Sequence, residues 1–341
     1  MGRKINDSYV LAKTDLSNLT GGETLKVEWD TVNNGNLHWK DVDESSLEYV
    51  APAVWYGDRG LIAGSHIDGN LDIDYFNIPT TGNAADFGDL VSPYIRQQGA
   101  TSNGSRGVWM GGRGASRYDR IDYVTISTLG NATDFGNITS ARSGAGACSD
   151  GTKGLLGGGN FSGGDIKNII DYITIATTGN SVDFGDLVSS RYVTYGLGND
   201  TRGVFAGGHT GSAASNIMEY VTIATTGNTT DFGDLTSSKF EGGGCSSRTR
   251  GIFAGGDVVG NVVNTIEYIT ISTTGNATDF GDLTVARGLA GSACSNSIRG
   301  VFGSDADDTL DYITIASTGN ATDYGNLTSS DIYQAGACAG D

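Results

Sequence analysis

Amide and carboxylate side chains recur at a fixed spacing along this chain, and their oxygen atoms could bind a metal ion. One copy of the repeated string runs from Thr273 to Leu283 and contains Asn276, Asp279 and Asp282. Calcium prefers such oxygen ligands, but the spacing is not that of an EF-hand loop and no bidentate Glu follows. Asn and Asp also stabilise turns through their own backbone. We therefore expect turn formation, with weak calcium binding as the alternative and no other cofactor.

Several other motifs suggest catalysis but lack the partners that the chemistry needs. Asp-Phe-Gly binds magnesium in protein kinases, yet no Gly-rich loop with a downstream Val-Ala-Ile-Lys and no His-Arg-Asp accompanies it. The cysteines form no Cys-x-x-Cys motif and are expected to be small buried residues (Cys148, Cys245, Cys294, Cys338). An enzyme site normally departs from the surrounding repeat, and no pair of acids does so here. We predict that the protein is not an enzyme.

The overall charge and hydropathy exclude two classes of partner. The 341 residues include 39 Asp or Glu and 21 Lys or Arg, which gives a formal net charge of −18. Because nucleic acids are bound by clustered basic residues, we predict no nucleic-acid partner. No long apolar run is present, so we predict no membrane insertion. Residues 1–7 are not followed by the apolar stretch of a secretory signal, so no signal peptide is expected.

A repeat of about 48 residues must position all of these side chains. Its tyrosine recurs with spacings of 48, 49, 48, 48 and 44 residues (Tyr75, Tyr123, Tyr172, Tyr220, Tyr268, Tyr312). Each copy contains four strand-like runs, exemplified by 143–148, 154–159, 268–272 and 279–283. Small residues suit the first run near a crowded axis, and Tyr and Ile of the third run are expected to face inward. Four short strands in a radially repeated unit of this length predict an all-β, six-bladed β-propeller.

The two ends of the repeat region complement each other. The first copy begins at 58–64, which matches the second strand of a unit, and the last copy ends at 334–341, which matches a first strand. The C-terminal strand is therefore expected to complete the first blade and close the ring. The aromatic residue of each Asp-Phe-Gly-Asp motif is expected to lie on the outer strand and to pack between blades.

Residues 1–50 do not follow the repeat, so the chain is divided into an N-terminal module (1–50) and a propeller (51–341). Two short alternating segments, 24–29 and 36–40, flank the turn-rich residues 33–35 and predict a β-hairpin.

The N-terminal module carries Trp29, His38 and Trp39, which we predict to dock onto partner proteins. Tryptophan is favoured at protein interfaces because it buries a large area. The alternative is that Trp29 and Trp39 pack against the first blade.

The connection between the second and third strands differs in every copy, whereas the rest of the unit repeats. These six connections are expected to share one face of the disc, and divergent loops on a rigid scaffold commonly form binding surfaces. Drift of unconstrained solvent loops is the alternative. The predicted ligand-binding residues are His66, Asp68, Arg113, Arg117, Tyr118, Asn160, Phe161, His209, Asp257 and Asp305.

The Gly-Gly that ends the second strand, followed by a variable loop and a strand with Tyr, resembles the kelch propeller pattern, with Phe or Tyr in place of the usual outer-strand Trp. The string Thr-Thr-Gly-Asn-Ala-Thr-Asp-Phe-Gly-Asp-Leu at 273–283 is similar to tandem repeats in tail-fibre-like virion proteins of tailed phages, especially marine ones. The similarity covers about residues 58–341. It implies a virion component that assembles in the host cytoplasm and contacts other virion proteins. It also implies a homotrimer as one arrangement, because phage appendages are often trimeric.

These features together predict a phage virion structural protein, a tail-fibre or appendage component whose propeller loops bind a glycan or protein of the host surface. The alternatives are a purely architectural decoration protein of the tail or capsid, and a carbohydrate-active enzyme on a propeller.

Overall fold

The computed structural model describes residues 3–5, 8–10, 30–32, 36–38, 57–65, 71–91, 96–289, 291–303 and 307–340. Residue contacts divide the chain into two units, Met1–Val54 and Trp55–Asp341. All elements of the described residues are β-strands, and no helix among them is long and apolar enough to cross a membrane.

The first unit contains two short antiparallel strand pairs. One joins β1 (Arg3–Ile5) to β2 (Ser8–Val10), and the other joins β3 (Asp30–Val32) to β4 (Asn36–His38). The second pair flanks 33–35, as predicted, but its first strand lies at Asp30–Val32. The predicted strand 24–29 lies outside the described residues.

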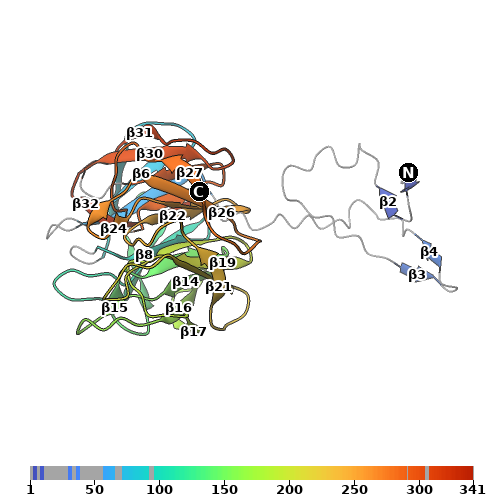
Figure 1. Ribbon diagram of the computed structural model, residues 1–341, viewed down its shortest axis with the longest axis horizontal. Coiled ribbons are helices and arrows are strands. Elements are labelled where there is room, and N and C mark those ends of the chain that lie inside the picture. The colour runs from blue at the N-terminus through green and yellow to red at the C-terminus, as the bar shows by residue number, and fades with distance from the viewer. Residues whose placement is uncertain are drawn as a thin grey trace. The chain divides into compact units, whose positions relative to one another are not determined.

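The second unit is a six-bladed β-propeller built from antiparallel four-stranded sheets (Figure 1), which confirms the predicted fold class. The blades, from inner to outer strand, are as follows: β32 (Ile332–Gly340), β5 (Arg59–Ser65), β6 (Asp72–Asn77) and β7 (Ala85–Asp89); β8 (Gly99–Ser102), β9 (Arg106–Met110), β10 (Arg120–Thr125) and β11 (Thr133–Asn137); β13 (Gly146–Ser149), β14 (Lys153–Gly157), β16 (Ile169–Thr174) and β17 (Val182–Asp186); β18 (Tyr195–Gly198), β19 (Arg202–Ala206), β20 (Ile217–Thr222) and β21 (Thr230–Asp234); β22 (Gly243–Ser246), β23 (Arg250–Ala254), β26 (Thr265–Thr270) and β27 (Thr278–Asp282); β28 (Ala293–Ser295), β29 (Arg299–Phe302), β30 (Thr309–Thr314) and β31 (Thr322–Asn326). They are called blades 1 to 6 below.

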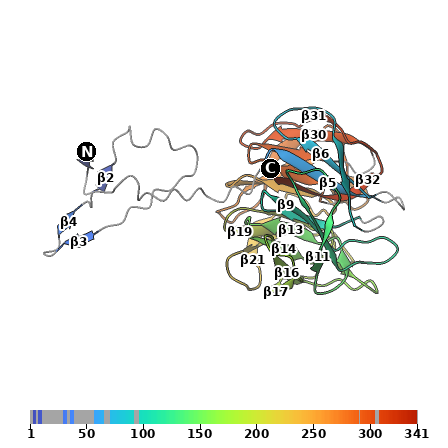
Figure 2. The ribbon, with the colours of Figure 1, turned by 180° about the vertical axis from the view of Figure 1, so that it is seen from behind.

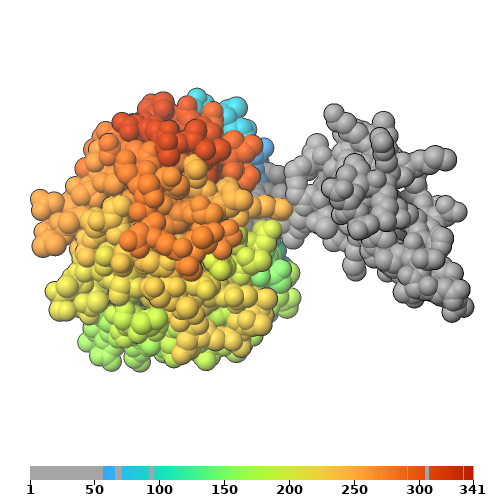
Figure 3. Space-filling model, turned by 45° about the vertical axis from the view of Figure 1, so that its right-hand side comes forward, coloured from blue at the N-terminus to red at the C-terminus, as the bar shows by residue number. Residues whose placement is uncertain are grey.

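The ring is closed by the strand nearest the C-terminus, as predicted. β32 pairs with β5, and Gly340 lies opposite Arg59 (Figure 2). Trp109 of blade 2 donates a hydrogen bond from Nε1 to the carbonyl of Gly336 at 3.0 Å, which ties β32 to its other neighbour. On the surface, the last and first blades lie in contact (Figure 3). Blade 1 is therefore assembled from the two ends of the repeat region.

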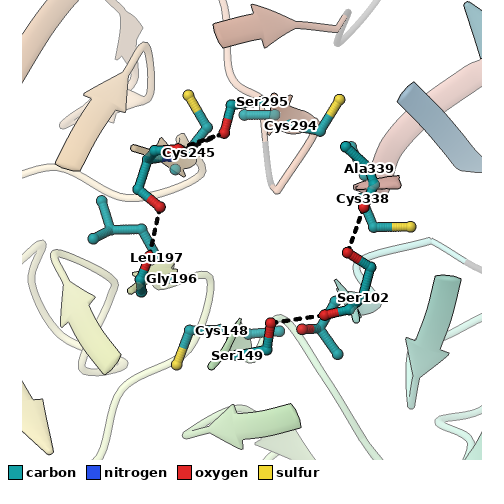
Figure 4. Close-up of a pocket in the computed structure, with 17 residues that line it drawn as sticks. Ser102, Cys148, Ser149, Gly196, Leu197, Cys245, Cys294, Ser295, Cys338 and Ala339 are labelled. Carbon is teal, nitrogen blue, oxygen red and sulfur yellow. Dashed lines mark hydrogen bonds between the residues drawn. The ribbon is translucent and has the colours of Figure 1, made fainter. Parts of the chain in front are cut away.

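Small residues allow the inner strands to crowd around the axis. In Figure 4 the sulfur of Cys148 points away from the channel. It packs against Gly203 of the next blade so closely that a Cβ on Gly203 would lie only 2.5 Å from the sulfur. The same fit joins three more cysteines to glycines of the following blade (Cys245 to Gly300, Cys294 to Gly60, Cys338 to Gly107). All four thiols are free and buried, and burial raises the pKa of each. They are packing groups.

The outer rim is held by the repeated Gly-Asn turn. The backbone amides of Gly179 and Ser181 donate to β11 of the preceding blade, and the Asn180 side chain accepts a hydrogen bond from the Asn137 amide at 3.0 Å. Each turn thereby adds a short strand to the neighbouring outer edge, which would otherwise expose unpaired groups. Gly136 has φ +148°, and a Cβ there would overlap the carbonyl of Gly179. The glycine of each Asp-Phe-Gly motif thus leaves the space into which the turn of the next blade packs.

This rim clamp occurs between all six pairs of blades, so the repeated amide oxygens bond to the neighbouring blade rather than to their own turn. Calcium binding by these turns stays a prediction. The aromatic residue of each Asp-Phe-Gly or Asp-Tyr-Gly motif is buried, as predicted (Phe87, Phe135, Phe184, Phe232, Phe280, Tyr324). The six asparagines are Asn83, Asn131, Asn180, Asn228, Asn276 and Asn320.

A cation at the start of each second strand forms another clamp. The Arg202 guanidinium lies 4.4 Å from the ring centroid of Tyr220 and donates a hydrogen bond to the carbonyl of Ile271 in the next blade at 3.0 Å. The repeated tyrosine is therefore half-buried, between the core and a cation, while the isoleucines beside it face fully inward. The six cations are Arg59, Arg106, Lys153, Arg202, Arg250 and Arg299.

An acidic residue before each tyrosine is buried, which sequence analysis did not predict. A β-bulge between Ile170 and Asp171 turns the Asp171 carboxylate inward. This carboxylate accepts hydrogen bonds from the amide and hydroxyl of Thr139 and pairs with Arg142 at 3.1 Å. Three later blades repeat this buried ion pair (Arg191 with Glu219, Lys239 with Glu267, Arg287 with Asp311).

Candidate functional site

The variable connections leave the blades at the end where each inner strand begins, as the strand pairing of β13 with β14 shows. We call this end the loop face. β15 (Asn160–Phe161) and β24 (Asp257–Val258) both belong to it and lie at the left of the propeller in Figure 1. The predicted residues His66, Asp68 and Asp305 lie outside the described residues.

Each described loop is anchored to the linker that enters its blade from the preceding one. Arg113 pairs through its backbone with Arg96, and His209 pairs in the same way with Tyr192. β15 pairs with β12 (Arg142–Ser143), while the short hairpin of β24 and β25 (Asn261–Val262) is joined to its linker by backbone hydrogen bonds between Asp257 and Phe240. Each of these loops is therefore held to the linker of its own blade by backbone hydrogen bonds.

A series of backbone hydrogen bonds links the linkers of successive blades around the axis on this face. The Gln97 amide donates to the carbonyl of Gln334 at 2.7 Å, and the Gly144 amide donates to that of Gln97 at 2.8 Å. The series continues from blade to blade as far as Leu289, and we call its residues the axial collar (Gln97, Gly144, Val193, Glu241, Leu289, Gln334). Four non-glycine members have a left-handed backbone, with φ between 48° and 61° (Gln97, Val193, Glu241, Gln334). Such strained residues concentrate at functional sites.

Three arginines and one glutamate meet at the collar. Burial lowers the pKa of Arg113, and the nearby charges of Arg96 and Arg117 lower it further, while Glu241 opposes them. Burial and the charge of Asp257 raise the pKa of Glu241, and Arg113 and Arg96 oppose that shift. The three arginines belong to paired segments of blade 2, and Glu241 enters from blade 5, where its carboxylate accepts a 3.3 Å hydrogen bond from Gln334.

Aromatic side chains border this charged group. The ring centroids of Tyr192 and His209 lie 5.5 Å apart, and those of His209 and Phe240 lie 5.1 Å apart, both edge to face. All three are half-buried, and the Gly211 amide fixes the His209 ring with a 2.9 Å hydrogen bond to Nδ1. The three rings are called the aromatic group below; Phe240 precedes Glu241 in the chain, and Val193, which follows Tyr192, accepts a hydrogen bond from the Glu241 amide.

Below the collar the channel holds an enclosed cavity of about 40 Å³. Gln98 is the one large side chain among its described lining residues, which are otherwise Gly, Ala and Thr194. Gln98 is 3% exposed, and neither its amide nitrogen nor its amide oxygen has a hydrogen-bond partner among the described residues. A cavity of this size has room for a water molecule that would bond to the amide.

At the opposite end, the channel widens to a cavity of about 80 Å³ lined by inner-strand residues (Figure 4). The Ser102 and Ser149 hydroxyls donate to carbonyls of the preceding inner strand at 2.5 and 2.9 Å. Ser246 and Ser295 bond in the same way. These hydroxyls join blades to one another. No group of three or more His, Cys, Asp or Glu that could hold a metal ion occurs in the described part of the chain.

The structure thus brings together part of the predicted site. Arg113 and Arg117 lie at the collar, while His209 and Asp257 flank Phe240 there. Phe161 is 4% exposed and packs under Arg142, with its ring centroid 5.4 Å from the guanidinium.

Tyr118 lies farther along its loop, and its amide donates a hydrogen bond to the carbonyl of Gly112. Asn160 directly follows the Gly-Gly of its blade, as Arg113 and His209 do, and pairs with Ser143 of the linker. Both side chains are half-buried. Among the N-terminal candidates, His38 ends β4, and Trp29 and Trp39 lie outside the described residues.

Sequence reasoning missed the linker residues, chiefly Arg96, Gln98, Tyr192, Glu241 and Gln334. A usable signal was present. The Gly/Ala-rich run that leads into each inner strand is interrupted by large polar side chains only in certain blades, as in Gln97-Gln98 and Glu241. Departures from a repeat in its most restricted segment deserved the same weight as differences between loops.

No protein-family model matches the sequence, and no curated protein matches it.

Proposed function

We propose that this protein is a phage virion component in which a rigid propeller presents the loop face to the host surface. One observation carries the proposal. Side chains that repeat in every blade are occupied in contacts between blades, whereas those that differ between blades gather around the axis on one face. A repeated scaffold with one non-repeated face suits binding, because rigid elements hold loop residues in a fixed geometry.

In this proposal the first unit connects the propeller to other virion proteins, with His38, Trp29 and Trp39 as candidate contacts, and a homotrimer through this unit is one arrangement. The propeller binds a glycan or protein without chemical turnover. The buried carboxylates support a non-enzymatic role, because Asp171 and its counterparts are engaged by threonines and cations of the scaffold.

The test is to locate the protein in virus particles from the source of the sequence. Gold-labelled antibodies raised against the full-length protein should mark the tail appendages. In particles assembled with residues 45–341 alone, the label should be absent although the truncated protein remains soluble. Unlabelled wild-type particles would refute the virion assignment, whereas normal incorporation of the truncated protein would refute the role of the first unit. Release of oligosaccharides from host polysaccharide by the pure protein would favour an enzyme.

A further inference from the structure

Most cations of the propeller are already engaged, but three arginines at the axial collar are not. Six basic residues lie over the repeated tyrosines, and four more neutralise buried carboxylates. Arg96, Arg113 and Arg117 have no carboxylate within ion-pair distance among the described residues. The Nε atoms of Arg113 and Arg117 are buried without a hydrogen-bond partner there. Buried N–H groups without partners are costly, so a ligand that accepts these hydrogen bonds would be favoured.

The charge of this group is opposite to that of the whole molecule. The chain carries −18 overall, yet Arg96 and Arg117 both pair through the backbone with Arg113, which gathers three positive charges on neighbouring segments. Burial lowers the pKa of Arg113, and repulsion by Arg96 and Arg117 lowers it further; an anion bound between the arginines would relieve the repulsion. Carboxylates are suited to this position because a guanidinium can bind both of their oxygens at once.

A second set of atoms requires a ligand that both donates and accepts hydrogen bonds. Gln334 is 5% exposed and donates to Glu241 at 3.3 Å, but its Oε1 atom has no partner in the described residues. Glu241 and Gln334 Oε1 are acceptors, whereas the arginine N–H groups are donors. Hydroxyl groups can serve both kinds of atom, and water in the cavity can relay such contacts to Gln98.

The aromatic group adds an apolar surface beside these polar atoms. Binding sites for small molecules combine aromatic walls with a few fixed polar groups. Val193, which follows Tyr192, accepts a hydrogen bond from the Glu241 amide, so the aromatic group adjoins the same part of the axial collar. A ligand that carries a carboxylate, several hydroxyls and a flat apolar face is a carboxylated sugar.

We propose that the axial collar binds a carboxylated sugar residue, such as the uronic or sialic acid of a surface polysaccharide. Arg113 and Arg117 hold the carboxylate with Arg96 nearby, Glu241 and Gln334 accept hydrogen bonds from hydroxyls, and the sugar ring lies against the aromatic group. The inference rests on the proposed function, since it names the chemical class that the loop face recognises.

The experiment measures retention of the full-length protein on arrayed uronic-acid and sialic-acid oligosaccharides, each printed beside its methyl ester. Binding to at least one acid is expected, with at least tenfold weaker binding to its ester because the ester lacks the charge. Arg113→Gln should lower the affinity at least tenfold, and Tyr192→Ala should lower it as well. Arg248→Gln is the matched control, because Arg248 lies in a turn at the opposite end of the blades, near Asp200.

Circular dichroism and melting curves verify that each variant is folded. Equal binding to acid and ester, no binding to any acid, or an unchanged affinity of folded Arg113→Gln would overturn the inference. Binding to a neutral glycan that is unaffected by Arg113→Gln would also overturn it while leaving host-surface binding intact. Carboxylate binding by a protein absent from virus particles would instead refute the proposed function alone.

Discussion

At the scale of single residues, the acid before each repeated tyrosine is placed in three different environments. In blades 3 to 6 it has a buried cation, as Asp171 has Arg142. In blade 1 Asp74 is held by the Thr328 amide and hydroxyl, and burial raises its pKa. In blade 2 Asp122 accepts a hydrogen bond from the Val91 amide at 3.3 Å, with Arg120 3.9 Å away. The same carboxylate therefore contributes differently to stability from blade to blade.

Asp122 should make the protein less stable as pH rises. Burial raises the pKa of this carboxyl to about 6, against opposing effects of Arg120 and the Val91 amide. Between about pH 4 and 6 the folded protein holds a proton that the unfolded chain has released, so stability falls across this window. From about pH 4 to pH 7, Asp122→Asn should gain up to about 3 kcal/mol in unfolding free energy relative to wild type. Chemical denaturation at each pH measures it.

Asp171→Asn is the matched control at the equivalent position of the next blade. It leaves Arg142 buried without its counter-charge and should cost about 3–5 kcal/mol at neutral pH. If the stability of Asp122→Asn ran parallel to wild type from pH 4 to 7, Asp122 would not carry the raised pKa.

At the scale of elements, the contacts between blades are made by turns docking on strands. The turn of one blade supplies backbone donors to the outer strand of the preceding one, and the glycine of that strand provides the space. Each copy of the repeated string thus supplies both sides of the contact between blades: its Thr-Gly-Asn turn binds the preceding blade, and its Asp-Phe-Gly strand receives the turn of the following one. This packing accounts for the regularity of the string.

Gly136→Ala tests this joint, with Gly130→Ala as control. The two glycines have nearly the same φ, +148° and +149°, so the backbone strain of an alanine is shared. A Cβ at Gly136 would overlap Gly179, whereas a Cβ at Gly130 has no neighbour within 4 Å. We expect Gly136→Ala to be less stable than Gly130→Ala by about 1–3 kcal/mol in denaturant titration. Equal losses would mean that strain alone selects glycine.

At the scale of the whole molecule, the spacing of the tyrosines predicted the number of blades, and the complementary ends of the repeat region predicted how the ring closes. Three strands of every blade come from one stretch of chain, so local pattern was sufficient. The acid of the third strand was missed because a charged residue at a strand start is usually exposed, and only the bulge turns it inward. The collar was missed because Gln97, Glu241 and Gln334 come from separate blades, and no local pattern reports that they meet.

Removing residues 332–341 should abolish cooperative folding of the propeller. The deletion takes the partner of β5, the acceptor of the Trp109 hydrogen bond and the Cys338 side chain that fills the space at Gly107. The melting transition should be lost or strongly lowered. A synthetic peptide of residues 330–341 added in trans should restore it, whereas a scrambled peptide should not. An unchanged melting transition of the truncated protein would show that the ring does not depend on this strand.

The pairing of β32 with β5 also has a consequence for synthesis on the ribosome. β5 ends at Ser65 and its inner partner begins at Ile332. At a translation rate of about 5–20 residues per second, β5 is therefore without its partner for on the order of 15–50 seconds. Blades 2 to 5 can form in turn during this interval, because each takes its strands from one continuous stretch. Meanwhile the unpaired edge of β5 and its apolar side chains, Leu61 and Ile62, are exposed to other nascent chains on the same mRNA. Translation speed and chaperone occupancy, rather than final stability, would then set the yield of closed rings.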